Sequence, residues 1–464
     1  MELTIRLLGF LLSIVYQILR PYFWWINRKP EPKISSVKNP ILKLSAVVIA
    51  EKIRRQELSS EAVVSAYIER IKEVNPLLNA VIENRFEAAI QEAKICDQKL
   101  AAGDVTAKEL EVEKPLYGVP ITVKESCAVK GLSHTGGSVA RSGVKASYDG
   151  TAVLIMKNAG AIPLCVTNTP ELCLGFESVN NLFGTTNNPY DTRRTAGGSS
   201  GGEGSLLGSS ASLIGIGSDI AGSIRIPAHF NGIFGHKPTP GIISIEGHFP
   251  NSDDVDIRRF LVIGPMARYA EDLALAVRVM ANRNSSSLRL NIPVDVKSLR
   301  IRFMEEIEES FGLISANEDV KLAVSKAAGY LDGIGADVRK VPISGKLLLG
   351  LSRHTASAII FKLLKDVKLL VPNSKISLYR AEVQKLQRIF TVIFHIISTC
   401  TVYCMIFNIL GFPSTHVPMG FDSEGLPIGI QIVALPMQDR LCLAVAKELE
   451  TGFGGWIPPY TATA

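Results

Sequence analysis

The feature that most constrains the fold is a Gly/Ser-rich stretch that runs directly into a strand-like segment. It begins as GGSSGGEG at Gly197, and the chain continues as LIGIGSDIAGSIRIPA from Leu213. A flexible linker would not lead into an apolar alternating segment that ends in a tight turn of small residues, so we expect this stretch to be folded. It also lacks GK[ST], and no GxGxxG lies between a strand and a helix, so a phosphate-binding loop is not indicated.

The composition is that of a globular protein. Of 464 residues, 47% are apolar and 20% are charged, which excludes disordered and collagen-like classes. The net charge of +6 is scattered along the chain, so no basic groove and no nucleic-acid partner are expected. The seven cysteines form no CxxC pair and the histidines no HExxH motif. We therefore expect reduced thiols, no metal site and no cofactor.

Helix and strand patterns alternate through the first half of the chain. The predicted elements are a helix that begins at Ser59–Ser60 and ends at Asn75–Pro76, a helix over Phe86–Leu100, a strand over Gly118–Lys124, a helix over Thr151–Asn158 and a strand over Ala161–Thr167. This alternation predicts an α/β fold. Lys124 would then lie at the end of a strand, where such folds present reactive groups.

The small-residue turn after Leu213 suits nucleophilic catalysis by serine. A serine that attacks a carbonyl needs a base within hydrogen-bond reach and donors facing the oxyanion. The backbone N–H groups of Ile220, Ala221, Gly222 and Ser223 are candidate donors, because their neighbouring side chains are small. The letters GxSxG occur at 197–201, but no apolar strand precedes them, so a nucleophile elbow is disfavoured. A lysine held neutral by burial can serve as the base instead.

These residues resemble the amidase signature family. The stretch Gly197–Ala228 is similar to the family's signature, and Lys124 lies in an accompanying GVPITVKE motif. The resemblance implies a Ser–Ser–Lys triad in which Ser223 is the acyl-forming nucleophile, Ser199 the bridging serine and Lys124 the base. It further implies three structural supports, which are Ser200, Asp219 and Arg225.

The resemblance extends from about residue 40 to the end of the chain. It carries landmarks such as GHKP at 235–238 and GLPIGIQ at 425–431. It implies the family's fold, a central mixed, twisted β-sheet covered by α-helices. The chain looks most like members that hydrolyse fatty acid amides, so the implied partner is a lipid amide. A homodimer is left open. The alternatives are an amidase or amidotransferase-type subunit acting on small polar amides, and a catalytically impaired membrane-bound member.

The N-terminus carries an apolar segment. Leu7–Leu19 has thirteen residues without a charge, and as a helix it would span about 20 Å, against ~30 Å of hydrocarbon. Tyr22, Trp24 and Trp25 follow, and such aromatic residues are typical of the membrane interface. No small-x-small cleavage site follows, so a removed signal peptide is disfavoured. We expect a retained anchor helix and a membrane-associated protein, single-pass or monotopic, on an internal membrane.

The predicted organisation is therefore an anchor segment and linker over residues 1–34 and a catalytic domain over residues 35–464. The domain departs from the family pattern at about 350–412, where it is short. Phe390–Leu410 has twenty-one residues without a formal charge, long enough to span a membrane. Its β-branched residues, His395 and Asn408 make a buried or interfacial element the preferred interpretation.

Overall fold

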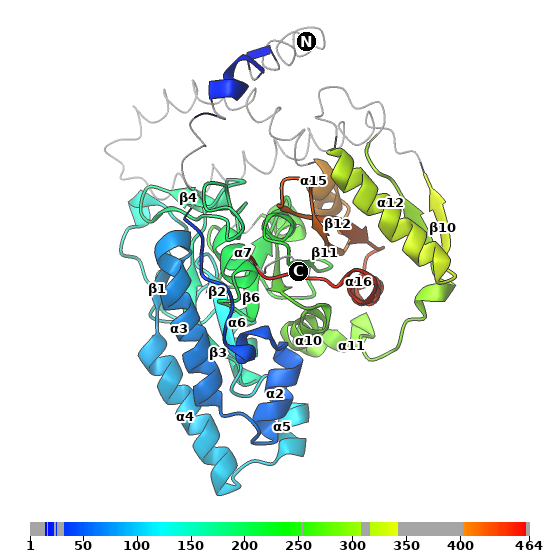
Figure 1. Cartoon of the computed structure of the whole chain (residues 1–464). Helices are drawn as coiled ribbons and strands as arrows, with labels where there is room; N and C mark the ends of the chain where they lie inside the picture. Colours follow the sequence, from blue (N-terminus) through cyan, green and yellow to red (C-terminus); the bar gives the residue numbers. More distant parts are fainter. Residues whose placement is uncertain are drawn as a thin grey trace.

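The computed structural model describes residues 14–15, 17–22, 25, 32–251, 254–307, 316–341 and 402–460. At its centre lies a sheet of eight strands in the order β1-β3-β2-β6-β8-β7-β11-β12 (Figure 1). These strands are β1 (Val81–Asn84), β2 (Pro120–Lys124), β3 (Ile162–Thr167), β6 (Ile214–Asp219), β7 (Phe234–Lys237), β8 (Val262–Ala267), β11 (Ser414–Phe421) and β12 (Pro427–Val433).

The sheet is mixed. Strands β3, β2 and β6 are parallel to one another, whereas β1, β8, β7, β11 and β12 each pair antiparallel with a neighbour. Two short ladders lie outside it, formed by β4 (Val179–Asn180) with β5 (Gly184–Thr185) and by β9 (Arg300–Phe303) with β10 (Asp337–Lys340). The expectation of a mixed central sheet is confirmed.

Helices pack along the whole width of the sheet. Helices α3 and α4 contact its β2–β3 half, α7 contacts β6, α10 and α16 contact β8 and β11, and α12 contacts β12 (Figure 1). The helices are α2 (Ala46–Arg54), α3 (Ser60–Leu78), α4 (Phe86–Ala102), α5 (Ala107–Glu113), α6 (Thr151–Asn158), α7 (Gly201–Gly208), α8 (Arg225–Phe230), α9 (Val255–Phe260), α10 (Ala270–Ala281), α11 (Ser285–Leu288), α12 (Glu318–Gly333), α15 (Val402–Ile409) and α16 (Asp439–Phe453).

The predicted elements of the first half all form, and their bounds differ by only a few residues. The one substantive correction concerns Pro76, which was expected to stop its helix but lies inside the last turn of α3. A proline there removes only one backbone donor. Asn79, in the left-handed region at φ 48°, ends the helix, and Asn75 Oδ1 accepts hydrogen bonds from the N–H groups of Ala80 and Val81.

The predicted anchor at residues 1–34 lies mostly outside the described residues. Its described parts, residues 14–15, 17–22 and 25, are helical, and the side chains of Ile18 and Trp25 are about two-thirds exposed, at 69% and 67%. Within the described ranges, no helix is both long enough and apolar enough to cross a bilayer. The anchor helix therefore stays a prediction.

The late charge-free run is described only from Val402 onward, and residues 342–401 lie outside the described residues. Its described part forms α15, in which Met405, Ile406 and Asn408 are buried. The described part of the run is thus a partly buried helix, and for residues 390–401 the buried or interfacial interpretation stays a prediction.

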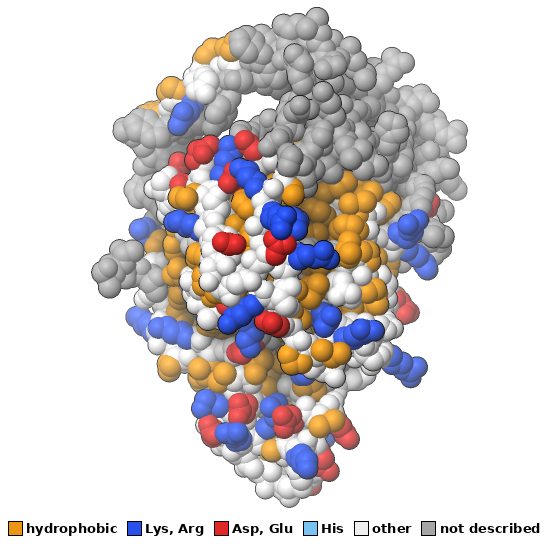
Figure 2. Space-filling view, turned by 90° about the vertical axis from the view of Figure 1, so that its right-hand side faces the viewer, with side chains coloured by type: hydrophobic (Ala, Val, Ile, Leu, Met, Phe, Trp, Pro, Cys, Tyr) orange, Lys and Arg blue, Asp and Glu red, His pale blue; other side chains and the backbone are white. Residues whose placement is uncertain are grey.

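The surface seen in Figure 2 carries both signs of charge interspersed over its described part. Apolar side chains gather on the same face, next to the region that is not described. On this face, the charged side chains of the described residues form no stripe of a single sign.

Candidate active site

Lys124 ends β2 and lies inside the protein. All five residues of β2 are buried, and the side chain of Lys124 has an exposed fraction of 0%. Its Nζ lies 2.6 Å from Ser199 Oγ and 3.0 Å from Ser218 Oγ. A buried ammonium or amine needs polar partners, and two serine hydroxyls supply them here.

The sheet itself brings Ser218 beside Lys124. Strands β2 and β6 are parallel, with Val123 paired to Ile216, so the carboxyl ends of both strands meet at one edge. Ser218 lies one residue before the end of β6. This contact was not anticipated from the sequence, because it depends on the pairing register of two strands that are far apart in the chain.

Ser199 is held by the loop that leads into α7, where close approach of other backbone demands glycine. A Cβ on Gly198 would lie 2.8 Å from Gly175 O, and a Cβ on Gly202 would lie 2.5 Å from Asn168 N. Side chains larger than hydrogen are therefore excluded at both positions. Ser178 Oγ donates to the carbonyl oxygens of Gly197 and Ser199 at 3.1 and 3.3 Å. These contacts fix the loop against its neighbours.

Ser223 lies in the turn between β6 and α8 and is partly exposed. The N–H of Ser200 donates to the carbonyl oxygen of Ser223 at 3.1 Å, which joins the turn to the Ser199–Ser200 loop. Ser200 Oγ donates to Ser218 O at 3.3 Å. Among the described residues, no hydrogen bond joins the hydroxyls of Ser199 and Ser223. The structure thus brings the side chain of Lys124 to Ser199. It brings the backbone of Ser223 to Ser200, the residue that follows Ser199.

A buried ion pair spans this turn. Arg225 Nη2 and Nε donate to the two carboxylate oxygens of Asp219 at 2.9 and 3.1 Å, and the two side chains are 2% and 0% exposed. The N–H groups of Gly222 and Ile224 donate to the same carboxylate at 2.8 and 3.0 Å. Burial alone raises the pKa of Asp219, but the charge and hydrogen bonds of Arg225 outweigh it and hold this pKa well below its usual range.

These bonds bear on the proposed oxyanion hole at residues 220–223. Because the N–H of Gly222 donates to Asp219, it is occupied in this structure. The N–H groups of Ile220, Ala221 and Ser223 have no acceptor among the described residues. Of the four candidate donors, only Gly222 therefore has its N–H occupied by a partner among the described residues, and the oxyanion hole stays a prediction.

Helix α15 packs directly on the turn. Arg225 Nη1 donates to Cys404 O at 3.0 Å, and Arg225 Nη2 donates to Asn408 Oδ1 at 2.6 Å. Asn408 Nδ2 in turn donates to Asp219 Oδ1 at 3.0 Å. A segment nearly two hundred residues away in the chain thus completes the ion-pair network.

Beneath the Lys124 end of β2 lies a buried carboxyl group, Glu203 of α7. It accepts hydrogen bonds from Thr122 Oγ1 and Thr167 Oγ1 at 2.5 and 2.8 Å. Burial raises the pKa of Glu203 to about 7, although both hydroxyls and the nearby Lys124 act to lower it.

Two further polar groups beside the site were not anticipated. His248 Nε2 lies 2.9 Å from Ser218 Oγ. Cys173 ends a short 3-10 turn (Glu171–Cys173) with φ at 59°. Burial raises the pKa of its thiol, but Lys124, His248 and Thr169 together lower this pKa to about 6. Neither residue belongs to a recognisable motif, so only the folded chain reveals them.

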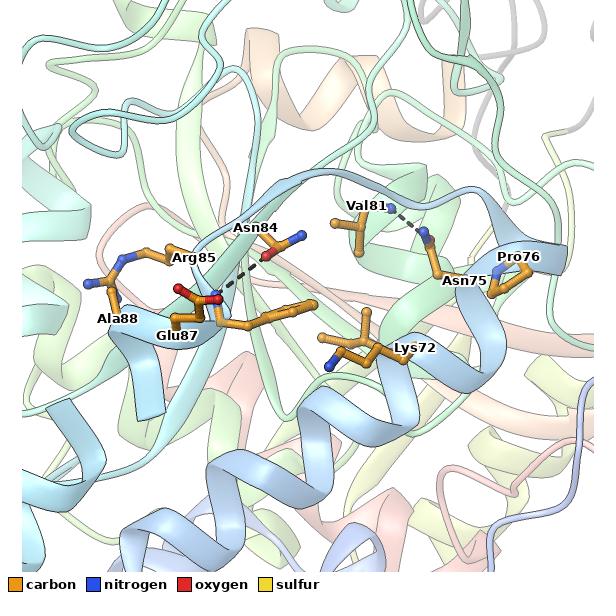
Figure 3. Close-up of a pocket in the computed structure, with 10 residues that line it drawn as sticks. Lys72, Asn75, Pro76, Val81, Asn84, Arg85, Glu87 and Ala88 are labelled. Carbon is orange, nitrogen blue, oxygen red and sulfur yellow. Dashed lines mark hydrogen bonds between the residues drawn. The ribbon is translucent and has the colours of Figure 1, made fainter. Parts of the chain in front are cut away.

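A separate cavity of about 750 Å³ lies between the end of α3 and the β1–α4 junction, and Figure 3 shows Lys72 and Arg85 at its wall. Its ten lining residues include no serine, cysteine or histidine. Its lining therefore offers no hydroxyl or thiol nucleophile for acyl transfer. In the described part of the chain, no three His, Cys, Asp or Glu side chains cluster to hold a metal ion.

Comparison with known proteins gives concordant findings. The amidase family profile matches residues 62–347 and 369–443. The chain is 39% identical to fatty-acid amide hydrolase 2-A of Danio rerio, over 99% of this chain and 98% of that protein, and 37% identical to fatty-acid amide hydrolase 2 of Homo sapiens, over 98% and 97%. A solved structure of a fatty acid amide hydrolase superposes with a TM-score of 0.71 at 23% identity, over 90% of this chain and 87% of that one.

Proposed function

Because the chain belongs to the amidase family, we propose that it hydrolyses fatty acid amides through an acyl-enzyme formed at Ser223. The family membership makes it an amide hydrolase closely related to fatty-acid amide hydrolase 2.

In the first half of the reaction, Ser223 Oγ attacks the amide carbonyl carbon. Its proton passes to Ser199 Oγ while Ser199 passes its own proton to Lys124 Nζ. The tetrahedral oxyanion accepts hydrogen bonds from the free N–H groups at 220, 221 and 223. The C–N bond then breaks, and the departing nitrogen takes up a proton returned through Ser199, which releases the amine.

In the second half, water attacks the ester carbon and loses its proton along the same path. The C–O bond to Ser223 breaks, Ser223 Oγ is reprotonated, and the fatty acid leaves. Net hydrolysis consumes one amide and one water and yields one acid and one amine. Asp219 and Arg225 keep the turn in the shape that presents Ser223, and Ser200 ties the turn to its loop.

The observation that carries the proposal is the 2.6 Å approach of Lys124 Nζ to Ser199 Oγ in a fully buried setting. Lysine side chains are seldom fully buried in proteins unless they are paired, usually with a carboxylate. Here its hydrogen-bond partners are two hydroxyls rather than an anion. This favours proton transfer over a structural ion pair.

The substrate class rests on relatedness and on the apolar N-terminal segment. Two relatives at 39% and 37% identity over almost their full length are named fatty-acid amide hydrolases. Ile14, Ile18, Tyr22 and Trp25 are helical and exposed, as a segment that contacts lipid would be. We propose that the protein associates with membranes through this segment and meets its substrate there.

A fluorophosphonate probe tests the nucleophile. Ser223 Oγ would bond to phosphorus as fluoride leaves, and peptide mass spectrometry would locate the adduct. The full-length protein should be labelled at Ser223, Ser223→Ala should be unlabelled, and the exposed-serine control Ser142→Ala should behave as the parent. Lys124→Ala should label about 10²–10⁴-fold more slowly. Equal labelling of the parent and Ser223→Ala would refute the assignment.

A substrate panel tests the acyl specificity. Acetamide, a medium-chain amide and oleamide should be hydrolysed with kcat/KM rising along the series, because each buried methylene contributes ~0.8 kcal/mol. A preference for acetamide would favour the alternative of an amidase for small polar amides. Hydrolysis of none would favour an impaired family member.

A further inference from the structure

His248 lies outside the Gly197–Ala228 signature, yet the fold fixes it beside Lys124. It belongs to the connection between β7 and β8 and forms an antiparallel bridge with Cys127. The N–H of Phe249 donates to Ser126 O at 2.7 Å, and the N–H of Ala128 donates to Gly247 O at 2.9 Å. The connection is thereby tied to the segment that directly follows Lys124. The side chain of His248 is 3% exposed.

The contacts of the imidazole ring define where its proton lies. Nδ1 lies 2.8 Å from Pro250 O, and a carbonyl oxygen only accepts hydrogen bonds, so Nδ1 carries a proton and donates. In a neutral ring Nε2 is then an acceptor. Nε2 lies 2.9 Å from Ser218 Oγ and 3.2 Å from Ser126 Oγ.

This tautomer sets the direction of the Ser218 hydroxyl. Nε2 has one electron pair and two hydroxyl neighbours, of which Ser218 Oγ is the nearer, at 2.9 Å against 3.2 Å for Ser126 Oγ. The single O–H of Ser218 therefore points at Nε2. The lone pairs of Ser218 Oγ then receive a hydrogen from Lys124 Nζ at 3.0 Å. A neutral lysine that donates to Ser218 keeps its own electron pair for the other neighbour, Ser199, at 2.6 Å.

We infer that His248 is a positioning residue for the proton relay: its neutral form turns Ser218 O–H away from Lys124 and leaves the lysine electron pair to Ser199. This inference rests on the proposed function. A protonated His248 would donate from Nε2 to Ser218 Oγ. The Ser218 proton would then turn toward Lys124 Nζ and compete with Ser199 for the same electron pair.

The titratable groups that face His248 come from three other segments. Lys124 at the end of β2 reaches it through Ser218. The Cys173 thiol interacts with both His248 and Lys124, and His134 interacts with His248 through space. A proton added to His248 therefore also places positive charge close to Lys124. This charge lowers the affinity of the lysine amine for the proton that it must accept from Ser199, so it too slows the relay.

The experiment measures the second-order rate of fluorophosphonate labelling at Ser223 against pH, with full-length protein. On this inference the relay needs both Lys124 and His248 in their unprotonated forms. The labelling rate of the parent should therefore fall by about 100-fold for each pH unit at the acid end, whereas an enzyme that needs only Lys124 unprotonated should lose about tenfold. His248→Gln retains an acceptor for Ser218 and has no imidazole to protonate, so its profile should show the tenfold slope.

Two further variants complete the design. Ser218→Ala removes the link between the ring and Lys124, so it should also show the tenfold slope even though His248 remains. His134→Gln changes a neighbouring histidine that does not contact Ser218, and it should keep the steep parental profile. Circular dichroism of each variant checks that the fold is retained.

The possible results distinguish a failure of the role of His248 from a failure of the proposed function. A parent labelled at Ser223 with a tenfold slope, or a His248→Gln profile that superimposes on a steep parental one, overturns the role of His248 alone. A parent that is not labelled at Ser223 removes the proposed function and this inference with it. The expected reduction of slope in both His248→Gln and Ser218→Ala supports the inference.

Discussion

Removing Arg225 should destabilise the fold by an amount that depends on pH. In Arg225→Met, the Asp219 carboxylate stays buried at 0% exposure. It loses both guanidinium bonds and keeps three neutral donors, the N–H groups of Gly222 and Ile224 and the amide of Asn408. Deleting one partner of a buried ion pair costs about 3–5 kcal/mol.

This cost converts into a thermal shift. An unfolding entropy of about 2.1 cal/mol/K per residue gives roughly 1 kcal/mol/K for a chain of this length, so Tm should fall by about 3–5 °C at pH 7. The matched control is Arg302→Met. Arg302 pairs with Asp337 at the surface, where the two side chains are 39% and 38% exposed, and such pairs contribute about 0–1 kcal/mol. Its Tm should change by less than about 1 °C.

The pH dependence identifies the cause. The pKa of Asp219 is lowered in the folded parent, so its stabilising contribution is present above the unfolded-state pKa and is lost only as pH falls toward the folded value. In Arg225→Met, the charge and hydrogen bonds of the guanidinium no longer offset burial, so the carboxyl group should take up a proton at a higher pH than in the parent. The Tm gap between parent and variant, measured by differential scanning calorimetry, should narrow from pH 7 to pH 4.5. A gap below 1 °C at pH 7, or one that widens on acidification, would refute the reasoning.

Two other stability predictions follow from the site. The pKa of Glu203 is raised to about 7, so its contribution to stability is present below the unfolded pKa and lost as pH rises through 7. The Tm of Glu203→Gln minus the Tm of the parent should therefore increase from pH 5 to pH 8. If scanning fluorimetry gave the same Tm difference at both pH values, the prediction would be wrong. Gly202→Ala should yield little soluble protein, because its Cβ would meet Asn168 N at 2.5 Å, whereas Gly329→Ala in α12 meets nothing within 4 Å and should match or exceed the parental Tm. Equal soluble yields of the two variants would count against the close packing at Gly202.

The local elements were predictable because their signals are local. The helix over Thr151–Asn158 and the strand that ends at Lys124 follow from periodicity and from punctuation by glycine and proline. Pro76 misled the prediction because a proline in the last turn of a helix costs little when Asn75 and Asn79 supply the termination.

The candidate site was predictable only in part. The residues that the sequence did not reveal reach it through contacts between segments that lie far apart in the chain. Ser218 meets Lys124 through the register of β2 and β6, and His248 meets Ser218 from 30 residues away. Asn408 reaches Arg225 across 183 positions. Nothing in the local sequence around Ser218 and His248 marks them, since a serine in a strand and a histidine in a loop are ordinary choices at such positions.

Trapping the covalent intermediate tests the central claim most directly. Full-length protein is mixed with oleamide, quenched in acid during turnover, digested and analysed by peptide mass spectrometry. The account predicts an oleoyl ester on the peptide that contains Ser223, absent from Ser223→Ala. Continued hydrolysis with the acyl group on Cys173, or with no acyl-peptide at all, would contradict it.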